Sequence, residues 1–135
     1  MINFTSKPRY MLDDLIRLVH ALRAPGGCPW DAAQTHLSIR RNFLEEAYEA
    51  CEALDCDDEA MLREELGDVL FAAVRVASTL DRDPEQALHA ACEKFITRFA
   101  AMEHAFLAAG EHLEDLSREQ LLAGWNAQKR AGGEQ

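Results

Sequence analysis

The chain of 135 residues lacks a long apolar run. No stretch approaches the roughly 20 consecutive apolar residues that a membrane-spanning helix needs. The first residues, 1–14, also lack the apolar core of a secretory signal. We therefore expect a cytoplasmic protein without a membrane partner. Its length suits one domain with a single core, residues 1–135, with loose ends at 1–8 and 131–135.

Basic residues are scarce. The chain has 14 Lys and Arg against 24 Asp and Glu, which gives a formal net charge of −10. Binding to a nucleic-acid polymer needs a basic surface that neutralises phosphates, so this class of partner is excluded. A small phosphorylated ligand remains compatible, because a metal ion and a few placed cations can hold it on an acidic protein.

Several motifs of metal, nucleotide and hydrolase sites are also missing. The four cysteines form no C-x-x-C pair and are expected to be small fillers or free thiols, and without an H-E-x-x-H motif a zinc site is not predicted. No histidine stands three residues after a glutamate, which excludes the ferritin-like di-iron pattern. The glycine-rich loops that bind phosphates, G-x-G-x-x-G and G-x-x-x-x-G-K-[ST], are both absent. No serine sits in the hydrolase motif G-x-S-x-G.

Strand patterns are absent, and helical periodicity takes their place. The sequence therefore predicts an all-α protein, a helical bundle of about four to five helices that dimerises through its central helices. Five helices are expected, approximately over Tyr10–Leu22, 35–54, 63–80, 83–109 and Ser117–Arg130. The second starts at Thr35 or Ser38, and the third lies in a wider helical frame of 61–80.

The segment Arg23–Thr35 contains two prolines and two glycines, and it is predicted to be a loop without regular structure. Trp30 in this loop has two interpretations. In the first, it packs into the core or over the end of the bundle. In the second, it offers a stacking surface near a ligand.

Two of the predicted helices carry carboxylates at matching positions. In the third helix, Glu65 and Asp68 fall roughly 60° and 120° to one side of the apolar stripe. In the second helix, Glu46 and Glu49 fall at about the same angles beside their own stripe. The two stripes consist of Leu62, Leu66, Val69, Ala73, Val76 and Leu80, and of Phe43, Ala47, Ala50 and Leu54.

A short link forces these two helices into an antiparallel pair, so the four carboxylates are expected to converge. Like charges at such distances repel or take up protons unless a cation lies between them. Hard oxygen ligands suit Mg²⁺ or Mn²⁺. The alternative is a set of solvated surface acids. Glu45, Glu52 and Glu64 are predicted to point to the backs of their helices.

The third helix is apolar on its back as well, where Phe71 and Val74 lie. A helix that is apolar nearly all round is buried on more than one side. We therefore expect a subunit contact there and a homo-oligomer, most simply a dimer. In the fourth helix, Lys94 and Arg98 lie four residues apart beside the apolar line. They are either snorkelling surface cations or a grip for phosphates.

Specific motifs resemble those of one family. The segments Gly27-Cys28-Pro29-Trp30-Asp31, Gln34-Thr35-His36, Glu45-Glu46-x-x-Glu49 and Glu65-x-x-Asp68 resemble the MazG family of nucleoside triphosphate pyrophosphohydrolases. Downstream, Glu93-Lys94-Phe95, Arg98-Phe99 and Trp125-x-x-x-Lys129 are similar to the later, catalytic domain of the two-domain members. The resemblance covers about residues 10–130.

The resemblance implies an all-α homodimer or dimer of dimers. It also implies Mg²⁺-dependent hydrolysis between the α and β phosphates to a nucleoside monophosphate and pyrophosphate, which would serve nucleotide-pool housecleaning. By the same resemblance the metal ligands are Glu46, Glu49, Glu65 and Asp68, the phosphate-contacting cations are Lys94 and Arg98, and the residues that help to hold the nucleotide are Trp125 and Lys129. With those four ligands occupied, Glu45 is the candidate general base.

The chain departs from this family in three respects. It has one such domain where long members have two, and Cys92 and Thr97 stand where related domains often have Asn and Arg. Two alternative functions remain open. One is a non-catalytic helical dimerisation module with a solvated or cation-filled acidic seam, and the other is a narrow pyrophosphatase for dUTP or dCTP.

Overall fold

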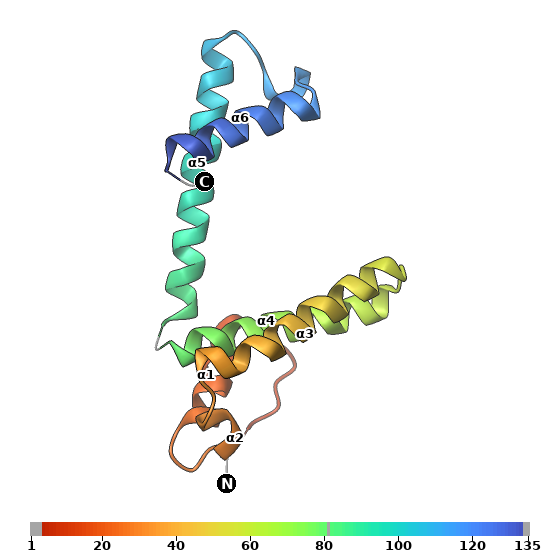
Figure 1. Cartoon of the computed structure of the whole chain (residues 1–135), viewed down its shortest axis with the longest axis vertical. Helices are drawn as coiled ribbons and strands as arrows, with labels where there is room; N and C mark the ends of the chain where they lie inside the picture. Colours follow the sequence, from red (N-terminus) through yellow and green to blue (C-terminus); the bar gives the residue numbers. More distant parts are fainter. Residues whose placement is uncertain (1–3, 81, 134–135) are drawn as a thin grey trace. The chain divides into compact units, whose positions relative to one another are not determined.

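The computed structural model describes residues 4–80 and 82–133, and within them it confirms the all-α prediction (Figure 1). All regular elements of these residues are helical. They are α1 (Leu12–Arg23), α2 (Pro29–Ala32), α3 (His36–Asp55), α4 (Glu59–Thr79), α5 (Pro84–Ala108), the 3-10 turn η1 (Leu113–Asp115) and α6 (Arg118–Ala131). None of the described helices combines the length and apolar character needed to cross a bilayer.

Side-chain caps explain where three of the helices begin. The Thr35 side chain accepts from the backbone N–H of Ser38 and opens α3. The Asp58 carboxylate accepts from the first N–H groups of α4, and Ser117 caps α6 in the same way. These caps satisfy N–H groups that lack partners in the first turn of a helix. The sequence predicts that the fourth expected helix ends near residue 109, and Gly110, at φ +78°, follows the end of α5 at Ala108.

The prediction that Arg23–Thr35 lacks regular structure is wrong in its middle. Residues Pro29–Ala32 form the short helix α2, with Pro29 in its first turn. Proline fits that position because its φ is already helical and a first-turn residue needs no N–H partner. Proline next to glycines predicts a break in a helix, whereas here Pro29 marks a helix start.

Residue contacts divide the chain into two compact units, Met1–Pro84 and Glu85–Gln135. That the two units form a single domain over residues 1–135 stays a prediction. Within the first unit, α3 and α4 pack along their lengths as an antiparallel pair, drawn in orange to green in Figure 1, and residues 56–58 join them. Helix α1 packs against both α2 and α4. The predicted loose ends fall partly outside the described residues, at 1–3 and 134–135; residues 4–8 are not helical.

The core of the first unit lies between α1 and α4. Ile16, Val19 and Val74 are buried there, and Phe71 packs against them. The sequence placed Phe71 and Val74 on the back of the helix at a subunit contact, and that assignment is wrong. Part of the predicted inner stripe is correspondingly open, because Leu66 is 50% exposed. The apolar residues on all sides of α4 obscured its true inner face.

In the second unit, α6 packs against the C-terminal half of α5. Met102 is buried, and the backbone of Gly124 approaches the Phe106 ring so closely that a Cβ would lie 2.6 Å from it. Apolar side chains earlier on α5 are less buried, since Leu88 and Phe95 are 52% and 55% exposed. All four cysteines are free thiols, and three are exposed rather than fillers: Cys51, Cys56 and Cys92.

Candidate metal site

The helix pair α3–α4 brings three of the four predicted ligands together. Glu46 and Glu49 lie one turn apart on α3, and Glu65 faces them from α4. One carboxylate oxygen from each of the three lies within 4.8 Å of the others. The equal wheel angles in the sequence predicted this convergence because the short link fixes the two helices side by side.

The site is electrostatically strained without a cation. Partial burial raises the pKa of Glu65, and the negative charges of Glu49 and Asp68 raise this pKa further. Glu64 and Glu46 contribute in the same direction. A carboxyl group whose neighbours are all acidic gains free energy either from a proton or from a metal ion.

The donor set fits a hard divalent cation. All three ligand groups are carboxylates, which suit Mg²⁺ or Mn²⁺. Around an octahedral Mg²⁺ with Mg–O bonds of about 2.1 Å, adjacent oxygens are about 3.0 Å apart and opposite oxygens about 4.2 Å apart. The three oxygens lie within 4.8 Å of one another, so side-chain rotations that bring them closer together would let them close on an ion.

Asp68 lies one turn after Glu65 on α4 and is exposed. It is outside the group of three, although its charge acts on Glu65. Its role as the fourth ligand stays a prediction. Glu45 points elsewhere: its Oε1 accepts from Nε of Arg41 at 2.7 Å in an exposed ion pair. Its role as a general base also stays a prediction.

Two residues that the sequence did not identify are linked to Glu46 by hydrogen bonds, Asn42 directly and Arg75 through Asn42. Asn42, one turn earlier on α3, donates from Nδ2 to Oε1 of Glu46 at 2.8 Å. Arg75 on α4 donates from Nη1 to Oδ1 of Asn42 at 3.1 Å. The spacing of Asn42 from Glu46 was a usable signal, since residues four apart on a helix are neighbours. No local signal connects Arg75 to Asn42, 33 residues earlier.

The predicted substrate-binding residues belong to the second unit. Lys94 and Arg98 lie on α5, and Trp125 and Lys129 lie on α6. The Trp125 ring contacts that of Phe95, with centroids 5.2 Å apart. Trp125 also lines an apolar groove of about 370 Å³ between the two helices. The Arg98 guanidinium reaches the end of α6, where a Cβ on Gly132 would lie 3.8 Å from Nη2.

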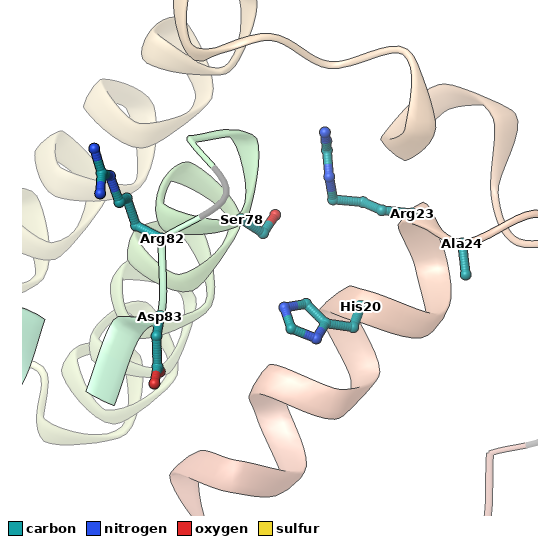
Figure 2. Close-up of a pocket in the computed structure, with 6 residues that line it drawn as sticks. All are labelled: His20, Arg23, Ala24, Ser78, Arg82 and Asp83. Carbon is teal, nitrogen blue, oxygen red and sulfur yellow. The ribbon is translucent and has the colours of Figure 1, made fainter. Parts of the chain in front are cut away.

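A separate hollow of about 560 Å³ lies at the C-terminal ends of α1 and α4 (Figure 2). Figure 2 shows His20 and Arg23 of α1 across from Ser78 of α4. Ser78 is 13 residues beyond Glu65, about 20 Å along the helix axis. The Arg23 guanidinium is already engaged, because it donates to the carbonyls of Asp31 and Gln34. This hollow is therefore distinct from the acidic cluster.

Comparison with known proteins connects this geometry to one family. Residues 34–102 match the family model of the MazG nucleotide pyrophosphohydrolase domain, and this segment includes all four predicted carboxylates. The crystal structure of a MazG-related protein from Thermotoga maritima matches with a TM-score of 0.60 and 27% identity, covering 87% of this chain and 98% of that one.

Curated relatives agree. A nucleoside triphosphate pyrophosphohydrolase from Mycolicibacterium smegmatis is 33% identical over 91% of this chain. The nucleoside triphosphate pyrophosphohydrolase/pyrophosphatase MazG of Thermotoga maritima is 44% identical over 47% of it. The matched regions span 37% and 25% of those two proteins. The carboxylate-bearing helix pair and the family match over half of its length place the chain in the MazG nucleotide pyrophosphohydrolase domain family.

Proposed function

We propose that this chain is a Mg²⁺-dependent nucleoside triphosphate pyrophosphohydrolase, with Mn²⁺ as a possible substitute. The reaction breaks the phosphoanhydride bond between the α and β phosphorus atoms, and water supplies the new oxygen and the protons. The products are a nucleoside monophosphate and pyrophosphate. The observation that carries the proposal is the cluster of Glu46, Glu49 and Glu65 on a helix pair of the MazG domain family.

Each proposed residue has a defined task. Glu46, Glu49 and Glu65, with Asp68, would hold the ion, which supplies charge stabilisation for the phosphates and acidifies water. Lys94 and Arg98 would bind phosphate oxygens and neutralise the charge of the departing pyrophosphate. Trp125 and Lys129 would help to hold the nucleotide.

The test is release of pyrophosphate and monophosphate from the eight common NTPs and dNTPs, with Mg²⁺ and with a chelator. We expect metal-dependent release of both products from at least one nucleotide. Glu46→Gln should abolish it, whereas Glu52→Gln on the exposed surface of α3 should not. If the folded protein neither binds metal nor hydrolyses any nucleotide, the non-catalytic dimerisation module is the better description.

The same panel decides between broad and narrow substrate choice. Release confined to dUTP or dCTP would identify a narrow pyrophosphatase, and release from many nucleotides would identify a housecleaning enzyme. The proposed substrates are metabolites of the cytoplasm, so the proposed activity belongs to that compartment.

Glu45 is the proposed general base, and its ion pair with Arg41 would have to open for that role. Glu45→Gln keeps the shape of the side chain but cannot take a proton. We expect kcat to fall by about 100-fold or more while Mg²⁺ affinity is unchanged, since general bases contribute factors of this size. Full activity in this variant would assign Glu45 to the Arg41 ion pair alone.

We also propose assembly as a homodimer or dimer of dimers. Large apolar side chains of α3 and α4 are exposed in the single chain, among them Leu37, Tyr48 and Leu70. Such side chains, where they form a patch, mark interaction surfaces. Sedimentation velocity at several concentrations tests the assembly. We expect Leu70→Lys to shift it towards the monomer, and a monomer at all concentrations would contradict the proposal.

A further inference from the structure

Three elements of the first unit meet at the guanidinium of Arg75. Its Nη2 donates to Oδ1 of Asp31 in α2 at 3.0 Å, and its Nη1 donates to Oδ1 of Asn42 in α3 at 3.1 Å. Its Cζ lies 4.7 Å from the centroid of the Trp30 ring. Arg75 itself belongs to α4, so it joins α2, α3 and α4 through one side chain.

Its surroundings hold the guanidinium of Arg75 in one position. The side chains of Arg75 and Asp31 are each only 14% exposed. At this degree of burial a charged group is costly unless its hydrogen bonds are made. The aromatic face of Trp30 adds a favourable contact with the cation. The ion pair and the ring together hold the guanidinium in place.

The guanidinium in turn orients the amide of Asn42. An amide has a donor end and an acceptor end, whereas arginine has only donors. The oxygen of Asn42 must therefore face Arg75, and the NH₂ group faces away from it. That NH₂ group donates to Oε1 of Glu46 at 2.8 Å. The reversed amide would lose both hydrogen bonds at once.

We propose that Asn42 and Arg75 are positioning residues for Glu46. The chain Arg75–Asn42–Glu46 fixes one carboxylate oxygen of Glu46 and so sets the direction in which the other donor sites meet a divalent cation. The ordered segment around Trp30 and Asp31 is coupled to the acidic cluster through this chain. The inference rests on the proposed function in one respect only, namely that the cluster binds a metal ion.

The sign of one substitution separates positioning from simple electrostatics. Arg75 is positive, so by charge alone its removal should strengthen cation binding at a nearby cluster. If Arg75 acts by orienting Asn42, its removal should weaken cation binding instead. Loss of a residue that orients a metal ligand typically costs 10- to 100-fold in affinity.

The experiment measures Mn²⁺ affinity of the full chain by titration calorimetry or by the EPR signal of free Mn²⁺, without nucleotide. We expect Arg75→Met and Asn42→Leu each to weaken binding by about 10-fold or more. Arg63→Met is the matched control, because Arg63 is also on α4 and pairs with Glu59 at the surface. Its Mn²⁺ affinity should equal or slightly exceed that of the wild type, because this variant removes a positive charge without touching Asn42. Circular dichroism confirms that each variant is folded.

Two further variants sharpen the result. The double variant should bind Mn²⁺ no more weakly than Asn42→Leu alone, because Arg75 acts through Asn42; independent effects would add. Arg75→Lys keeps the charge but cannot serve both acceptors with the same geometry, so it should also bind weakly. Wild-type Mn²⁺ affinity in Arg75→Lys would overturn the inference. Unchanged or tighter Mn²⁺ binding in folded Arg75→Met would overturn it as well.

Activity is a separate readout. If the wild type hydrolyses nucleotides but the variants keep its Mn²⁺ affinity, the positioning role fails and the proposed function stands. If the wild type binds Mn²⁺ and hydrolyses nothing, the proposed function fails and the affinities still decide the positioning role. If the wild type binds no Mn²⁺, both are wrong.

Discussion

Glu49 on α3 faces Glu65 on α4, and its negative charge contributes to the raised pKa of Glu65. Partial burial of Glu65 is the larger cause, and the two effects act in the same direction. The ionised site therefore opposes folding in the absence of a cation. A ligand set that costs stability when empty is expected where cation binding compensates for the repulsion.

Neutralising Glu65 should stabilise the metal-free protein. With a chelator at neutral pH, we expect Glu65→Gln to melt at a higher temperature than the wild type, because burial and repulsion no longer act on a charge. Mg²⁺ should raise the melting temperature of the wild type and raise that of Glu65→Gln much less. Glu52→Gln is the control and should behave like the wild type. Destabilisation of metal-free Glu65→Gln would contradict the electrostatic account.

The raised pKa of Glu65 also predicts a pH dependence. The folded protein binds this proton more tightly than the unfolded chain does, so the contribution to stability is present below the ordinary carboxyl pKa of 4.5. It is lost as the pH rises from there through the raised folded pKa. Denaturant unfolding of metal-free wild type and Glu65→Gln over this range checks the sign. The advantage of the variant should grow with pH and then level off.

Asp14 acts in the opposite direction and must not be confused with this effect. The side chain of Lys7 and the backbone N–H of Met11 donate to its carboxylate and lower its pKa. Its contribution is present above the ordinary carboxyl pKa and is lost as the pH falls through the lowered value. Because wild type and Glu65→Gln share Asp14, the difference between their curves removes it.

Substitution of alanine at two glycines should change the free energy of unfolding in opposite directions. Gly67 lies within α4, and a Cβ there would meet nothing within 4 Å. Gly67→Ala should therefore stabilise the fold by about 1 kcal/mol through helix propensity. At Gly27 a Cβ would lie 2.3 Å from the carbonyl oxygen of Leu22, so Gly27→Ala should destabilise by about 2 kcal/mol or more. Urea unfolding measures both changes, and effects of the same sign would contradict one of the two assignments.

The inner face of α4 can be tested in the same assay. Val74 is 4% exposed and packs against α1, so Val74→Ala should cost about 2 kcal/mol of unfolding free energy. Leu70 is 60% exposed, and Leu70→Ala should cost less than about 0.5 kcal/mol at concentrations where the chain is monomeric. A larger cost for Leu70→Ala than for Val74→Ala would contradict the placement of Val74 in the core.

The sequence predicted the helices and the convergence of Glu46, Glu49 and Glu65 because both depend on local rules. Periodicity and capping residues act within a few positions, and a three-residue link dictates an antiparallel pair. The inner face of α4 could not be predicted in the same way. Apolar residues surround that helix, so only the position of α1 decides that Val74 is inside.

The Arg75 contacts show the other limit of sequence reasoning. Asp31 and Asn42 are 44 and 33 residues away, and polar residues at such separations carry no periodic signal. The prediction of a loop at Pro29 was wrong for a different reason. Proline can end a helix or start one, and the sequence alone favoured the first effect. Long-range polar contacts and ambiguous turn residues therefore needed the structure.

The three-residue link between α3 and α4 has a kinetic consequence. Contacts between residues close in sequence close small loops, which costs little chain entropy, and they form early in folding. Glu49 and Glu65 are 16 positions apart, whereas Val19 and Val74 of the core are 55 apart. The acidic hairpin is therefore expected to be assembled in the folding transition state before α1 docks. A divalent cation that binds it should then accelerate refolding and leave the unfolding rate nearly unchanged, because the transition state and the native state are stabilised alike.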